Sequence, residues 1–201
     1  MIVDFIFDVA SPNAYLAHRV IPDFEKRTGT TFNYIPCLLG GIHKLTNNQP
    51  PFVAFAEIKN KSDYQIIELE RFVKQHKLDK YKFNSHFPPS TIQIQRGASA
   101  AKELGVFEQY IECVLVAMWE NDKNLSDIEV LKETLNENDF DVNAIIEIVT
   151  SQACKDELIK NTDEAVSRGA FGVPTFFLNE QIFFGKDHLH QLEEYIYSLK
   201  N

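Results

Sequence analysis

Residues 173–184, VPTFFLNEQIFF, lie near the carboxyl-terminal end of the sequence and decide the fold. Two runs rich in β-branched and aromatic residues, 173–178 and 181–184, flank Asn179-Glu180, and this pattern predicts a β-hairpin. Val173-Pro174 opens the first strand, where the missing N–H of a proline is tolerated. We expect the Val173–Pro174 peptide to be cis.

A final helix is predicted after the hairpin, over residues 187–199. Leu189, Leu192 and Ile196 recur there at helical spacing. Asp187 precedes this apolar stripe, at the place where a helix cap is needed. The carboxyl-terminal end therefore predicts two strands followed by a helix that Asp187 caps.

The amino-terminal end predicts a strand, a helix and a second strand. Residues 2–9 are mostly β-branched and aromatic and lead to Ser11-Pro12, where serine suits a helix cap and proline suits the first turn. The helix is expected to end at Thr28-Gly29, since glycine is common just after a helix end. Residues 30–37 are extended in character. Such a unit normally places two parallel strands on a right-handed crossover.

The residues between these ends show mainly helical patterns separated by short polar breaks. Ile66, Leu69 and Val73 share one stripe in residues 65–76. Gly105 divides residues 91–119 into two helices. That stretch carries the apolar residues Leu104, Phe107, Ile111, Leu115 and Met118. Further helical patterns cover residues 126–136, 141–149 and 151–168.

These patterns predict an α/β protein with a β-α-β unit, an all-helical insertion and a β-β-α unit. We expect a discontinuous sheet domain made of residues 1–37 and 169–201. Residues 38–168 form the helical lobe, and its last helix belongs either to the lobe or to the sheet domain.

Composition and charge narrow the function. The chain has 201 residues, 44% of them apolar, and 20 basic residues against 29 acidic ones give a formal charge of −9. This excess of acid opposes nucleic-acid binding. We also expect no membrane span, since no apolar run approaches about 20 residues. We expect no signal peptide, since residues 1–12 have no basic segment ahead of their apolar run.

Cysteine and histidine usage adds two further expectations. Cys37, Cys113 and Cys154 are odd in number and widely spaced, which favours a reducing, cytoplasmic location over a disulfide scaffold. Cys37 is expected to be a small core residue. The six histidines match no metal-binding motif, so no metal site is predicted.

Ser11-Pro12-Asn13-Ala14 marks a candidate site, because a helix begins there directly after a strand. Unpaired N–H groups and the helix dipole favour a thiolate or carboxylate at such a position. An ordinary helix cap explains Ser11 equally well when the residue is taken alone.

Five segments in this order carry a resemblance to a known family. They are Ser11-Pro12-Asn13-Ala14-Tyr15-Leu16, Leu39-Gly40-Gly41-Ile42, Asn47-Asn48-Gln49-Pro50-Pro51, Gly169-Ala170-Phe171-Gly172-Val173-Pro174-Thr175 and Phe184-Gly185-Lys186-Asp187. Over nearly its whole length the chain resembles the 2-hydroxychromene-2-carboxylate isomerases and the kappa-class glutathione transferases. These enzymes are related to periplasmic thiol-disulfide oxidoreductases. The resemblance implies a thioredoxin-like fold with an inserted helical lobe.

The resemblance also implies that glutathione binds as cofactor or substrate. Ser11 would be the catalytic residue, donating its hydroxyl to the sulfur while the helix dipole lowers the thiol pKa. Val173, beside Pro174, would pair its backbone with the cysteinyl unit. Lys186 and Asp187 would hold the γ-glutamyl end. The remaining residues that the family pattern places at the glutathione site are Pro12, Asn13 and Asn48.

A second substrate site is less defined. Its candidate lining residues are Lys44, Lys61 and Tyr64. The alternative is that both lysines are solvated and the tyrosine is half-buried, without a role in binding. The segment from Leu39 to Pro51, expected as a loop, is closer to the transferase branch than to the isomerase branch. Lys186 replaces the serine that is frequent in the transferases.

Four functions are compatible with these residues to different degrees. The leading expectation is a glutathione-dependent isomerase acting on a small hydrophobic or aromatic electrophile, and a glutathione transferase is the first alternative. A non-catalytic module that binds a peptide or partner is another. A thiol-disulfide oxidoreductase needs cysteine where Ser11 stands. The resemblance further implies a homodimer.

Overall fold

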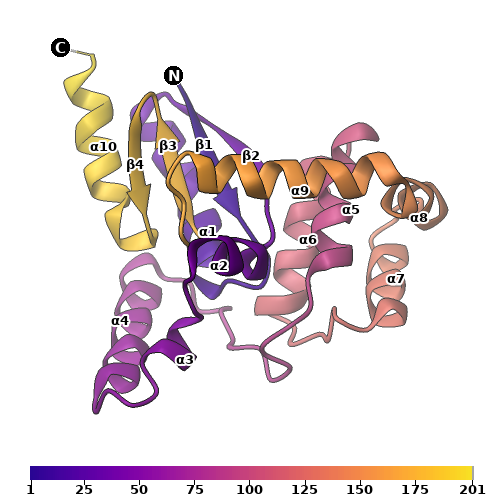
Figure 1. Cartoon of the computed structure of the whole chain (residues 1–201), viewed down its shortest axis with the longest axis horizontal. Helices are drawn as coiled ribbons and strands as arrows, with labels where there is room; N and C mark the ends of the chain where they lie inside the picture. The colour runs from indigo at the N-terminus through magenta and orange to yellow at the C-terminus, as the bar shows by residue number, and fades with distance from the viewer. Residues whose placement is uncertain (201) are drawn as a thin grey trace.

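The computed structural model describes residues 1–200 and centres on a four-stranded mixed sheet with the order β2-β1-β3-β4 (Figure 1). β1 (Ile2–Phe7) pairs in parallel with β2 (Thr31–Pro36) and antiparallel with β3 (Thr175–Leu178). β3 forms the predicted hairpin with β4 (Gln181–Phe184). Asn179 in the turn adopts φ 54°, which asparagine tolerates better than most residues. The thioredoxin-like arrangement of strands is confirmed.

α1 (Pro12–Thr28) connects β1 to β2 and has the predicted ends. The Ser11 hydroxyl accepts a hydrogen bond from the Ala14 N–H at 3.2 Å, and Pro12 occupies the first turn. Gly29 ends the helix at φ 62°, a left-handed conformation that costs glycine little. The cap directs the chain from β1 into α1 and so places Ser11 at the edge of the sheet.

The intervening helices lie close to the predicted ranges, with two additions, α2 and α3. They are α2 (Leu39–Thr46), α3 (Pro51–Ala54), α4 (Lys61–His76), α5 (Ile92–Glu103), α6 (Phe107–Trp119), α7 (Ile128–Glu137), α8 (Val142–Thr150) and α9 (Gln152–Ser167). Gly105 separates α5 from α6 at φ 72°, as expected. The expected loop at the start of this region was wrong, because α2 forms there and packs against α9.

The intervening helices lie in more than one place around the sheet. In Figure 1, α5 to α8 gather at the right of the view, whereas α3 and α4 lie at the lower left, below α10. α9 packs against β2 as well as against α2, α5 and α8, so it bridges sheet and helices. The division into residues 1–37 with 169–201 and residues 38–168 stays a prediction.

Two predicted apolar positions are exposed. Ile66 on α4 is 58% exposed, although Leu69 and Val73 of the same stripe pack against the core. Leu104 is 40% exposed because it follows the last turn of α5. Phe72 is the buried residue of α4, so this helix rests on the body of the protein along a narrow contact.

The end of the chain corrects the prediction for Asp187. A short 3₁₀ turn, η1 (Lys186–His188), comes first, and α10 (Leu189–Ser198) starts after it. His188 occupies the cap position of α10, and no side chain caps the helix. Asp187 is therefore not the helix cap, because its carboxylate is engaged by Lys186 instead.

The sheet is covered by a core rich in aromatic residues. Phe5 stacks on Phe176 with ring centroids 5.1 Å apart, and Trp119, Tyr15 and Tyr110 are among the largest fully buried side chains. Cys37 is fully buried, as predicted. Over residues 1–200, no helix is both long and apolar enough to cross a membrane.

Candidate active site

Ser11 and Val173 meet at the start of α1. The Ser11 hydroxyl donates to the Val173 carbonyl across 3.4 Å, although the two residues are 162 positions apart. The Val173–Pro174 peptide is cis, as predicted. An O–H···O contact of this length is weak, so the hydroxyl can turn to another acceptor at little cost. Ser11 is 5% exposed.

Two backbone N–H groups at this place have no acceptor within residues 1–200. One belongs to Asn13 in the first turn of α1, where orphan donors are expected, and the other belongs to Val173. Together with the Ser11 hydroxyl they form a group of donors at the positive end of a helix dipole. Such a group stabilises a bound anion, including a thiolate.

Asp8 fixes the loop that carries Ser11. Its carboxylate accepts the Ala10 N–H at 2.9 Å and the Leu39 N–H at 2.8 Å, and its carbonyl accepts the Ser11 N–H at 3.0 Å. The side chain is 1% exposed, and this burial raises its pKa above the ordinary range, against the opposing hydrogen bonds from Leu39 and Ala10. Asp8 thus ties the start of α1 to the start of α2.

Two more buried side chains brace the same loop from the helical region. The Gln95 amide donates to the carbonyls of Phe7 and Cys37, each at 2.9 Å, and is fully buried. The Trp119 indole N–H donates to the Val9 carbonyl at 2.8 Å. α5 and α6 therefore hold the β1–α1 connection in place, a role that the sequence did not reveal for either residue.

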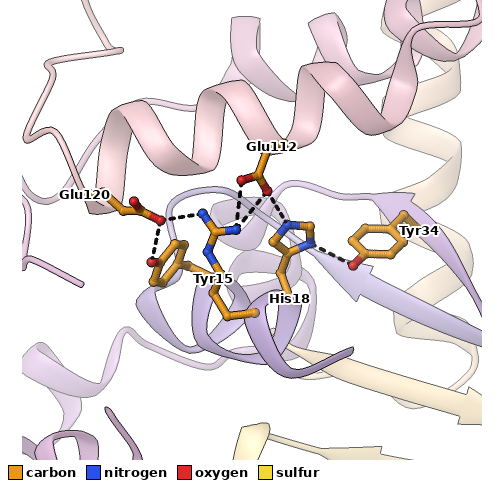
Figure 2. A network of polar contacts seen from close by, with 6 residues as sticks. Tyr15, His18, Tyr34, Glu112 and Glu120 are labelled. Atoms are coloured by element: carbon orange, nitrogen blue, oxygen red, sulfur yellow. Dashed lines mark hydrogen bonds and ion pairs between the residues drawn. The ribbon is translucent and has the colours of Figure 1, made fainter. Parts of the chain in front are cut away.

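A polar network fastens α1 to α6 (Figure 2). Arg19 donates to both Glu112 oxygens at 2.9 Å and pairs with Glu120, which also accepts the Tyr15 hydroxyl at 3.0 Å. His18 contacts Glu112 at 3.1 Å through Nε2. The hydrogen bond from His18, followed by the contacts from Arg19, lowers the Glu112 pKa to about 2.

Tyr34 on β2 completes this network, with its hydroxyl 2.7 Å from His18 Nδ1. Tyr15, His18 and Arg19 follow one another on the face of α1 turned toward α6, as Figure 2 shows for the two labelled members. Only the helical spacing of these residues is visible in the sequence. Their partners on α6 lie about a hundred residues away, so sequence reasoning missed the network.

Lys186 and Asp187 form a pair beside α4. The Lys186 ammonium donates to the two Asp187 oxygens at 2.8 and 2.6 Å and lies 4.9 Å from the Phe72 ring centroid. The Lys186 side chain is 2% exposed, whereas that of Asp187 is 42% exposed. Asp187 is thus reachable by a ligand, and Lys186 is covered. Their contact with glutathione stays a prediction.

Asn48 lies next to the Val173 loop. Its side-chain amide donates to the Phe171 carbonyl at 2.8 Å, two residues before Val173. Asn48 is exposed and so remains open to a ligand. The structure brings Asn48, Ser11 and Val173 to one region.

The candidate second-substrate residues are not drawn together by any contact among residues 1–200. Lys44 is exposed on α2. Lys61 lies over the Phe55 ring with its ammonium 4.5 Å from the centroid. Tyr64 is 56% exposed, so the half-buried environment considered for it was wrong.

The chain's own cysteines supply no reactive thiol to the site, because burial raises the pKa of each of them. Cys37 is the cysteine nearest to Ser11 in sequence, and burial raises its pKa to about 12. Over residues 1–200, no group of three or more histidine, cysteine, aspartate or glutamate side chains could hold a metal ion.

Comparisons with known proteins agree with this geometry. The family model of the DSBA-like thioredoxin domain matches residues 2–197. The chain belongs to this family. The chain is similar to 2-hydroxychromene-2-carboxylate isomerase of Sphingobium xenophagum, with 30% identity over 196 residues that cover 96% of this chain and 97% of that protein.

Two further proteins extend the comparison. Glutathione S-transferase kappa 1 of Caenorhabditis elegans is 29% identical over 213 residues, covering 96% of this chain and 89% of its own. The solved structure of selenomethionine 2-hydroxychromene-2-carboxylate isomerase matches with a TM-score of 0.84 and 25% identity, over 99% of this chain and 96% of that one. The predicted resemblance is confirmed at the level of family and fold.

Proposed function

We propose that this protein is a glutathione-dependent isomerase whose thiolate-activating residue is Ser11. Its relatives are named as isomerases or as glutathione transferases, which makes the chain an enzyme of this group. The observation that carries the proposal is the meeting of the Ser11 hydroxyl with the Val173 backbone at the amino terminus of α1. The isomerase branch is favoured because its three relatives are 27–30% identical to this chain, against 20–29% for the four transferases.

The donors of the site fit glutathione. The unpaired Val173 N–H and the Val173 carbonyl offer one extended peptide unit a donor and an acceptor, as in strand addition. Asp187 supplies an exposed carboxylate for the γ-glutamyl ammonium, and the Asn48 amide extends the polar surface beside Val173. Pro12 and Pro174 flank these groups.

Glutathione supplies a nucleophilic sulfur that adds to an electrophilic carbon and leaves again after rotation in an isomerase, or stays bonded in a transferase. The chain's own residues hold that sulfur as a thiolate. Ser11 turns its hydroxyl from the Val173 carbonyl to the anion, and the Asn13 N–H and the α1 dipole lower the thiol pKa from the same side. Asp8 and Gln95 hold the loop that carries these donors in position.

An aromatic cluster next to the site supports a flat, apolar electrophile. Phe87 lies 5.6 Å from Phe52 and 5.1 Å from Phe83 between ring centroids, and it reaches Trp119 at 6.4 Å. Phe52 and Phe83 are about half exposed. The Trp119 bond to the Val9 carbonyl fixes the cluster close to the loop that carries Ser11, where a bound aromatic ring can stack.

The two alternatives of a different class are weaker. Disulfide exchange needs a reactive thiol at the helix start, whereas Ser11 stands there and Cys37 is buried with a raised pKa. A non-catalytic binding module gives no reason for a hydroxyl placed among unpaired N–H donors. We therefore rank both below the isomerase and the transferase.

Calorimetric titration with glutathione, followed by turnover assays, tests the proposal. We expect saturable binding, then glutathione-dependent conversion of a 2-hydroxychromene-2-carboxylate without consumption of glutathione. Consumption of glutathione with an aromatic electrophile would identify the transferase. Saturable binding of a peptide without any turnover would identify the binding module, and absence of glutathione binding would refute the proposal.

We further propose that the protein acts as a homodimer in the cytoplasm. Several apolar side chains on α4 and just before it are at least 44% exposed: Ile58, Tyr64, Ile66 and Ile67. A second copy would cover such residues. Light scattering after size exclusion distinguishes a dimer from a 23.1 kDa monomer.

A further inference from the structure

A cavity lies beside the edge strand β2, where α5 and α9 pack against this strand. Its volume is about 190 Å³, which exceeds an apolar cavity of about 150 Å³ known to hold benzene. Ile6, Ile35 and Ala165 provide apolar lining, and α5 and α9 supply polar side chains. We call this space the β2-edge cavity.

One backbone unit of β2 is open toward this cavity. The N–H groups of Thr31 and Cys37 donate to β1, so alternation along the strand points the N–H and carbonyl of Tyr34 away from β1. On that outer edge the Phe32 N–H donates to Glu25 at 2.7 Å, and the Pro36 carbonyl accepts from Asn161 at 3.3 Å. Tyr34 is left with a donor and an acceptor that no described residue engages.

A buried hydroxyl in the same cavity also has no partner among the described residues. Ser99 on α5 is 5% exposed, and its hydroxyl forms no hydrogen bond within residues 1–200. An unsatisfied buried hydroxyl destabilises the fold, so such groups normally face a partner. A ligand in the cavity would provide one.

Charges of both signs surround the opening. Lys102 lies one helical turn after Ser99 on α5 and forms no ion pair within the described residues. Glu157 and Glu164 line the facing side on α9, where Glu164 also lies 3.6 Å from Lys160, and the nearby Arg168 is paired with Asp4 at 2.8 Å. Cation and carboxylates on opposite walls match a ligand that has an anionic and a cationic end.

We propose that the β2-edge cavity binds a short zwitterionic peptide. The peptide amide pairs with the Tyr34 backbone, and the carboxylate binds Lys102 with the Ser99 hydroxyl. The ammonium faces Glu157 and Glu164, and small apolar side chains rest on Ile6 and Ile35. The lining of this cavity includes neither Ser11 nor Val173, so the proposal does not depend on the proposed isomerase activity.

Residue-resolved NMR titration with dialanine tests this proposal. We expect saturable shifts of the Tyr34, Ser99 and Lys102 amides, and at least about tenfold weaker binding of N-acetyl-alanine amide, which lacks both charges. Lys102→Met should weaken dialanine binding about tenfold or more. Lys26→Met on α1, which removes the same charge away from the cavity, should leave it unchanged.

Three outcomes would overturn the proposal. They are absence of saturable shifts at these amides, shifts confined to the Ser11 region, and equal binding of the uncharged amide. Each of these outcomes refutes a site for a zwitterionic peptide, and the separate titration with glutathione still tests the proposed function.

Discussion

Replacing Ser11 by alanine separates a catalytic serine from a helix cap. The hydroxyl accepts the Ala14 N–H at 3.2 Å, and loss of a cap of this kind costs about 1 kcal/mol of unfolding free energy. Its bond to the Val173 carbonyl is long at 3.4 Å and adds little. The variant should therefore fold, with a stability loss close to that of one cap.

Turnover should fall much further than stability. One donor to a bound or developing anion is worth about 1.5–4 kcal/mol, which corresponds to a loss of roughly 10- to 1000-fold in rate. The assay is glutathione-dependent conversion at saturating glutathione, with urea unfolding of the same samples.

The chain offers a matched control in Ser151. This serine caps α9 by accepting the Cys154 N–H at 3.1 Å, far from Ser11 in the sequence. Ser151→Ala should lose about the same 1 kcal/mol and keep full turnover. Equal turnover in the two folded variants would refute the role given to the Ser11 hydroxyl.

Three further changes test other parts of the structure. Asp187→Asn should lower glutathione affinity about tenfold in calorimetry, and it should destabilise the fold by about 1–3 kcal/mol in urea unfolding because it leaves buried Lys186 unpaired. Adding Lys186→Met should restore the stability but not the affinity. The Glu112 pKa of about 2 in the folded state predicts a stabilising contribution that is full above about pH 4.5 and is lost as the pH falls toward 2. Glu112→Gln should remove this contribution, about 1 kcal/mol after solvent screening, together with its pH dependence. Identical denaturation midpoints of the two proteins at pH 7 and pH 3 would contradict this. Gly97→Ala should destabilise the protein by about 1–3 kcal/mol or more, because a Cβ there would lie 2.0 Å from the Tyr110 hydroxyl oxygen; an unchanged melting temperature would show that Tyr110 moves freely.

The Asp187 prediction also shows where local reasoning fails. A carboxylate just before an apolar helical stripe is typical of a cap, and the sequence contains nothing that separates this role from an ion pair. Asp187 instead binds Lys186, because the Lys186 ammonium is covered by Phe72 from α4 and needs a counter-charge. The start of α10 moves accordingly to Leu189.

The sequence by itself determined the order of strands and helices at both ends of the chain, the Ser11 cap and the turn at Asn179. These features depend on short-range chemistry: alternation and helical spacing, a side chain reaching its own backbone, and tolerance of a positive φ. The proximity of Ser11 to Val173 came from family resemblance rather than from such patterns.

Only the tertiary structure decided what surrounds the site. Gln95 and Trp119 fix the β1–α1 loop from about a hundred residues away, and Asp8 ties this loop to Leu39. The bonds from Arg19 to Glu112 and Glu120 join α1 to α6. These contacts depend on how helices pack on the sheet, which no local pattern encodes. A buried polar group needs a partner, but the local sequence around it does not indicate which distant residue will supply that partner.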